Sequence, residues 1–218
     1  MTLQEIIKIV IYIHVITGTL AMIAGVIAMI AKKGGKIHKK SGLLFFYSLL
    51  ISDVISLFVS VMPEHENTFL FCIGVFTLYL IMGGYLALRY KQKTVNLLAD
   101  KMLSTTMLIT GIGMIAYPII QFGQFNIVLG VFGMIGIAMS IIDFARYRNK
   151  AKMREKYLQL HLSKMIGGFI ASVTAFIVAN GMLSGLIGWL SPTFIGGLII
   201  GYWTIKLNRK RKNKANLT

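Results

Sequence analysis

The chain has 218 residues, of which 56% are hydrophobic and only 14% are charged, and it carries a net charge of +16 with a mean hydropathy of +0.74. An ordinary soluble domain has about 25% charged residues, and a soluble protein this apolar would be unable to cover its surface with polar groups. The composition therefore excludes a soluble globular enzyme and a disordered chain, the single cysteine excludes a disulfide-stabilised scaffold, and we expect an all-α integral membrane protein.

Seven apolar runs are long enough to cross a bilayer, which requires about 20 apolar residues per helix. They predict a polytopic membrane helix bundle of seven transmembrane helices, forming a single domain over residues 1–207 and followed by a basic tail at 208–218. In chain order the runs are Ile6–Ala31, Leu43–Met62, Phe69–Arg89, Leu103–Gln121, Asn126–Arg146, Leu158–Asn180 and Ser191–Leu207.

The seventh run is the shortest, but the pair Ser191-Pro192 is typical of a helix start. The apolar segment Gly181–Leu190 before it is too short to span, so we expect it to be an interfacial connection. If this segment were a span instead, the C-terminus would move to the other side of the membrane.

Basic residues alternate strictly with the predicted spans. Clusters of lysine and arginine follow the first, third, fifth and seventh runs, whereas the connections Pro63–Thr68, Phe122–Phe125 and Gly181–Leu190 contain none. The positive-inside rule then places the N-terminus outside and the C-terminus in the cytoplasm, as expected for a multi-pass protein of a bacterial inner membrane. Topology accounts for the positive charge, so the expected partner is the lipid bilayer and not nucleic acid; the oligomeric state stays open.

An ionisable residue deep inside a predicted span is costly and is a functional candidate by default, and His14 and Asp53 are placed in this way. His14 lies in the outer half of the first run and Asp53 near the middle of the second. A structural interpretation has His14 bonded to a threonine hydroxyl, and Asp53 protonated and bonded to a neighbouring hydroxyl group. A functional interpretation places both along the path of a small-solute or proton-coupled transporter.

Four further candidates, His38, Asp143, His161 and Lys164, fall near the cytoplasmic ends of the predicted helices. We expect His38, Asp143 and His161 to converge on one site, because a short basic loop joins the fifth and sixth runs and the first loop leaves the membrane on the same side. The alternatives are that Asp143 only pairs with Arg146 or Lys164, and that His38 is solvated in its lysine-rich loop.

Two histidines and a carboxylate suit a divalent metal such as zinc or iron, and also a proton relay or a head-group site. A haem would require His38 and His161 as its axial pair. The surrounding positive charge keeps an imidazole neutral, which is the ligand form, but it opposes a bare cation and favours an anionic partner such as a lipid head group or a quinone-like molecule. The sequence assigns no catalytic residue. An intramembrane zinc-dependent hydrolase would typically have His-x-x-x-His on a late helix, and only His161 is present there.

Several stretches resemble a bacterial family of multi-span membrane proteins catalogued only as a domain of unknown function. The resemblance is carried by His14-x-x-x-Gly18, by the segment from Lys33 to Gly42 with its Gly-Gly-Lys-x-His element, by His161-x-x-Lys164-Met165 running to Phe176, by Asp143 with Arg146, and by the segment from Trp189 to Thr193. It implies a multi-span membrane protein with recurring histidines and no established activity.

Overall fold

The computed structural model describes residues 2–183 and 185–215, and in that part of the chain it contains seven α-helices and one short 3-10 helix. The chain divides into two compact units, Met1–Leu78 and Tyr79–Thr218, and the boundary falls inside the third helix.

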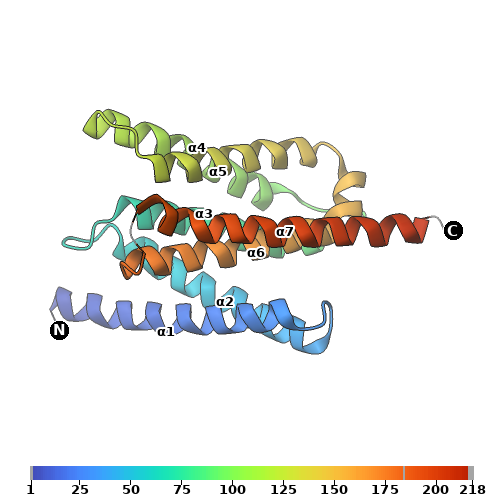
Figure 1. Ribbon diagram of the computed structural model, residues 1–218, viewed down its shortest axis with the longest axis horizontal. Helices are drawn as coiled ribbons and strands as arrows, with labels where there is room; N and C mark the ends of the chain where they lie inside the picture. Colours follow the sequence, from blue (N-terminus) through green and yellow to red (C-terminus); the bar gives the residue numbers. More distant parts are fainter. Residues whose placement is uncertain (1, 184, 216–218) are drawn as a thin grey trace. The chain divides into compact units, whose positions relative to one another are not determined.

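The first unit is built on an antiparallel hairpin of α1 (Leu3–Ile30) and α2 (Lys36–Val59), to which the first part of α3 (Thr68–Ala87) is added (Figure 1). Thr2 and Glu5 form a capping box that satisfies free amides at the start of α1. The two helices approach closely at Gly18, where an added Cβ would lie 3.0 Å from Oγ of Ser52. Small residues at such a crossing let helices pack in lipid without a hydrophobic driving force.

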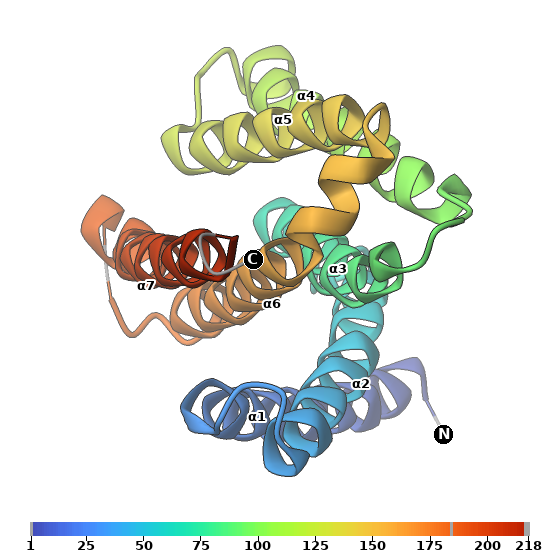
Figure 2. The same cartoon turned by 90° about the vertical axis from the view of Figure 1, so that its right-hand side faces the viewer.

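The second unit contains the remainder of α3, the 3-10 helix η1 (Leu88–Lys91), α4 (Leu98–Phe122), α5 (Ile127–Tyr147), α6 (Lys150–Ala179) and α7 (Gly185–Ala215). Helices α4 and α5 lie side by side, as do α6 and α7 (Figures 1 and 2). Glycine again sets the closest approach, because a Cβ on Gly111 of α4 would lie 2.9 Å from the carbonyl oxygen of Gly133 on α5.

In the part of the chain that it describes, the structure confirms an all-helical architecture, with six helices that are long and apolar enough to cross a membrane. Two of them begin well before the apolar run that predicted them: α2 begins at Lys36 instead of Leu43, and α6 at Lys150 instead of Leu158. Lysine is a good helix former, and Asn149 caps α6 by accepting from the amide of Lys152. These helices therefore extend beyond the apolar stretch of the sequence, and a search for apolar runs misses their polar first turns.

The predicted start of the last helix at Ser191 is wrong. Helix α7 begins at Gly185, so Gly185–Leu190 is helical and Pro192 lies inside the helix. Proline lacks the amide that would bond to the carbonyl of Gly188. The hydroxyl of Ser191 lies 3.5 Å from that carbonyl oxygen and partly replaces the missing donor, so a Ser-Pro pair that is typical of a helix start is accommodated within a helix.

Candidate functional site

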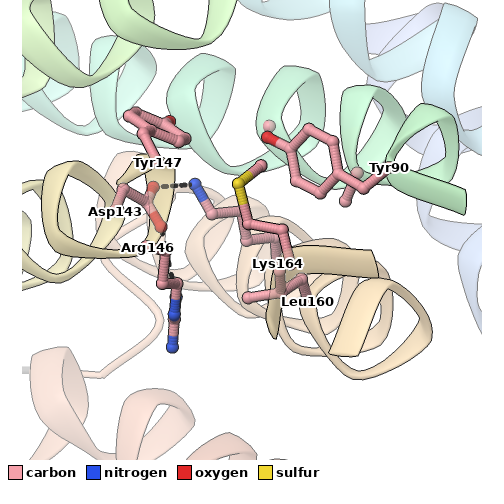
Figure 3. Close-up of a pocket in the computed structure, with 9 residues that line it drawn as sticks. Tyr90, Asp143, Arg146, Tyr147, Leu160 and Lys164 are labelled. Carbon is pink, nitrogen blue, oxygen red and sulfur yellow. Dashed lines mark hydrogen bonds and ion pairs between the residues drawn. The ribbon is translucent and has the colours of Figure 1, made fainter. Parts of the chain in front are cut away.

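A buried ion cluster joins α3, α5 and α6 in the second unit. Figure 3 shows its pair of Asp143 and Lys164. Asp143 of α5 is 3% exposed and forms an ion pair with Lys164 of α6, which is 6% exposed. Lys164 bonds to Oδ2 of Asp143, and the hydroxyl of Tyr79 donates to the same oxygen at 2.7 Å. Oδ1 of Asp143 accepts from Arg146 at 3.1 Å. We call Tyr79, Asp143, Arg146 and Lys164 the Asp143 cluster.

Local sequence spacing explains how two of these side chains meet. Asp143 and Arg146 are three residues apart on one helix, and side chains at this spacing share a face. Arg146 extends outward from the pair, and its side chain is 40% exposed.

Lys164 reaches Asp143 because α3 has a glycine where α6 crosses it. A Cβ on Gly83 would lie 2.8 Å from Nζ of Lys164, and a Cβ on Gly84 would lie 3.0 Å from Sδ of Met165. The ammonium group also lies 4.0 Å from the centre of the Tyr79 ring, which stabilises a cation at that position. The glycine pair and the tyrosine together create the environment in which a lysine can be buried.

The charges of the Asp143 cluster do not cancel. One carboxylate faces one ammonium and one guanidinium group, so the cluster carries a formal charge of +1. A buried charge is tolerated only when it is paired and hydrogen-bonded. The pair with Lys164 is neutral, so the excess positive charge resides on Arg146, the most exposed member.

A small cavity adjoins the cluster and has room for about one water molecule (Figure 3). Asp143, Arg146 and Lys164 contribute its charged groups. Its remaining lining comes from Gly83, Ala87, Tyr90, Tyr147, Met153 and Leu160.

A second carboxylate is held beside this cavity. Asp100 of α4 accepts from Arg89 at 2.9 Å and from the Tyr90 hydroxyl at 2.5 Å. The Tyr147 hydroxyl contacts the backbone carbonyl of Asp100 at 3.2 Å and Oγ of Ser104 at 2.9 Å. Tyr90 and Tyr147 line the cavity as well, so they connect the Asp100 pair to the Asp143 cluster.

No motif in the sequence marks Tyr79, Tyr90 or Asp100 as a site residue. Tyr79 resembles a core aromatic in an apolar helix, Tyr90 stands between Arg89 and Lys91 just after an apolar run, and Asp100 stands in the first turn of a helix, where an acid is common. The basic residues near Asp100 in the sequence indicate that this acid has a cationic partner, but they do not indicate that the partner is Arg89. Asp143 does form the ion pairs that the alternative interpretation named, and it forms them with both Arg146 and Lys164.

Three histidines bond through Nδ1 to a backbone carbonyl. His161 contacts the carbonyl of Gly84 at 2.9 Å, one residue from the glycine that admits Lys164. His38 contacts the carbonyl of Ala28 at 2.9 Å, and His14 that of Ser52 at the same distance. A carbonyl only accepts, so Nδ1 carries the proton in each ring.

His38 also helps to complete the end of α1. The carbonyl of Ala28 is one of the last four of that helix, which have no intrahelical donor. The Ala28 carbonyl accepts a hydrogen bond from His38 and another, at 3.1 Å, from the ammonium group of Lys33. Partial burial lowers the pKa of Lys33. His38 belongs to the first unit and Asp143 and His161 to the second, so their convergence on one site stays a prediction.

Within residues 2–183 and 185–215, no three His, Cys, Asp or Glu side chains are grouped so that they could hold a metal ion. The neighbours of Asp143 are cations and a tyrosine hydroxyl, which compete with a metal for the carboxylate. Asp53 of α2 is 8% exposed and belongs to the first unit, whereas the Asp143 cluster belongs to the second.

A family model described as "Predicted membrane protein (DUF2306)" matches residues 11–109. The match covers His14, His38 and Asp53 and ends inside α4, before Asp143, His161 and Lys164. The resemblance to a membrane-protein family of unknown function is therefore confirmed for that part of the chain. No curated protein and no solved structure matches the chain.

Proposed function

From the family match and the apolar helices we infer that this membrane protein crosses a bacterial inner membrane seven times, with its N-terminus outside and its C-terminus in the cytoplasm. The distribution of charge supports this: the segments after α1, α3 and α5 and the end of α7 are basic, and the other connections have no lysine or arginine. Helix α7 has 31 residues, more than the roughly 20 that a span requires.

Site-directed labelling tests this orientation in intact cells. Cys72 is replaced by serine, and a single cysteine is placed at His65 or at Lys93, which lie in a non-basic and a basic connection respectively. A membrane-impermeant maleimide is expected to label the first variant in intact cells and the second only after the cells are broken. The reverse pattern would contradict the orientation.

We propose further that the Asp143 cluster binds a phosphate-type anion, either the head group of an anionic lipid or a free phosphate, at the cytoplasmic face. The formal charge of +1 carries this proposal. The guanidinium group of Arg146 is half-exposed beside a neutral buried pair, so an oxyanion that bonds to it would neutralise the excess charge. Further basic residues on α6 and in the segment before α4 add to the positive potential, and their surroundings are expected to be lipid head groups and not nucleic acid.

Metal and haem binding have less support. The carboxylate of Asp143 is already neutralised by an ammonium group, and His161 is oriented by a backbone carbonyl on α3. A zinc-dependent hydrolase would require a ligand group that residues 2–183 and 185–215 do not present. We therefore favour a binding protein over an enzyme.

Binding is measured on the full-length protein in a non-ionic detergent, by thermal stabilisation and native mass spectrometry. The probes are inorganic phosphate, phosphatidylglycerol and, as the neutral comparison, phosphatidylcholine. We expect Arg146→Gln to weaken binding of the anionic probe about tenfold or more, since a hydrogen bond to a charged group contributes about 1.5–3 kcal/mol. Arg146→Gln leaves the Asp143–Lys164 pair intact, so this variant is expected to fold.

Arg148→Gln is the matched control, because it removes the same charge from an exposed residue two positions away. Binding of phosphatidylglycerol alone would identify the anion as a lipid head group, and binding of both anionic probes would identify the phosphate itself as the ligand. Equal loss in the two variants, or equal binding of phosphatidylcholine, would contradict a specific anion site.

A further inference from the structure

Asp53 differs from the other two aspartates of the chain. Asp100 and Asp143 each have an arginine within 3.1 Å and a tyrosine hydroxyl. Asp53 is 8% exposed, and its Oδ2 is fully buried and has no hydrogen-bond partner among residues 2–183 and 185–215. It is also the sole acidic residue between Glu5 and Glu64 in the sequence.

Within the first unit, the surroundings of Asp53 do not supply a counter-charge. It stands in the apolar part of α2, and the neighbouring helix α1 presents His14 at this level. His14, however, is engaged by the preceding residue: Nδ1 lies 2.9 Å from both the carbonyl and the hydroxyl oxygen of Ser52, and that hydroxyl also contacts the His14 carbonyl at 3.1 Å. The first part of α3 contributes Cys72 as its one ionisable side chain.

A carboxylate that is buried in apolar surroundings without a partner loses its hydration and gains nothing in return. The cost is many kcal/mol for an ion and far less for a neutral acid, so a group in this position takes up a proton. A monovalent metal cation is the other way to neutralise it, but hard cations require several oxygen ligands. The nearest hydroxyl in sequence, that of Ser52, is occupied with His14.

We propose that Asp53 is a proton-binding site: a neutral carboxylic acid inside the first unit that exchanges its proton with the solvent. This inference is independent of the anion site, because it concerns a residue of the other unit and requires no contact with the Asp143 cluster. It identifies the residue that a proton-coupled activity of this protein would use.

Infrared spectroscopy tests the proposal on the full-length protein in lipid vesicles at neutral pH. The protein carries aspartate labelled with ¹³C at the side-chain carboxyl, so that the three aspartates are separated from the four glutamates. We expect one carbonyl stretch of a protonated acid beside the bands of two carboxylates, and a downshift of that stretch when the vesicles are transferred to D₂O. The absence of a protonated band from the spectrum of the unsubstituted protein would overturn the proposal, so this outcome does not depend on a variant that folds.

Asp53→Asn then assigns the band, because asparagine has nearly the same shape and no acidic proton. Loss of the protonated band in this variant is expected. Three carboxylate bands and no protonated acid would overturn the proposal, as would a protonated band that does not respond to D₂O. The alternative, a site for a monovalent metal cation, is tested by replacing choline chloride in the buffer with sodium chloride at constant pH and ionic strength. Conversion of the protonated band to a carboxylate band by sodium would show a cation site instead.

Discussion

A Cβ atom on Gly83 would lie 2.8 Å from Nζ of Lys164, so the absence of a side chain on α3 makes room for the buried ammonium group on α6. The ion pair with Asp143 therefore depends on a residue that carries no functional group. His161 and Lys164 are one turn apart on α6, and both contact α3 at the pair Gly83-Gly84. The ion pair therefore forms only when α3 and α6 are packed together.

Gly83→Ala is expected to lower stability by about 1–3 kcal/mol, because overpacking at a close contact displaces the lysine from its partner. The measurement is the midpoint of thermal unfolding in a non-ionic detergent. Gly113→Ala is the matched control: it is a glycine inside α4 with nothing within 4 Å of the added Cβ, and alanine there is expected to be neutral or mildly stabilising. Equal destabilisation by both substitutions would argue against a packing role for Gly83.

The two members of the buried pair are expected to differ in their sensitivity to substitution. Asp143→Asn leaves both Lys164 and Arg146 without their carboxylate, whereas Lys164→Met leaves Asp143 paired with Arg146 at 3.1 Å. Removing one partner of a buried pair typically costs about 3–5 kcal/mol, so we expect Asp143→Asn near that range and Lys164→Met below it.

Combining these two substitutions measures their interaction. The double variant is expected to lose less stability than the sum of the single losses, with a coupling free energy of about 0.5–3 kcal/mol, because Lys164→Met removes the ammonium group that Asp143→Asn leaves without its carboxylate. Strictly additive losses in detergent unfolding experiments would show that the pair contributes nothing as a pair.

Tyr90→Phe tests the second carboxylate. The substitution removes the hydroxyl that lies 2.5 Å from Asp100 and keeps the ring in the core formed with Ala87, Met153 and Leu160. We expect a loss of about 1–3 kcal/mol, since a buried acceptor is left with one donor fewer. Tyr12→Phe provides the comparison, because Tyr12 is 69% exposed and is expected to change stability by less than about 0.5 kcal/mol.

Residues 6–31 and 43–62 illustrate what apolar patterning can predict. A run of about 20 apolar residues specifies a helix, because every backbone amide and carbonyl in lipid must be satisfied within its own segment. The capping pattern is less reliable at Ser191-Pro192, where α7 continues through a sequence typical of a helix start. A proline indicates a lost hydrogen bond, and whether the helix ends there depends on what replaces that bond.

The sequence by itself determined that the chain is all-helical, that it is built for a membrane, and that Asp143 and Arg146 share one face of a helix, because each of these follows from local period and composition. Only the tertiary structure decided which partners the buried acids have. Tyr79 and Gly83 acquire their roles from the way α3 meets α5 and α6, and Tyr90 acquires its role from the way η1 meets α4. Interhelical register is set by the fit of side chains from distant segments, and no periodicity within one segment encodes it.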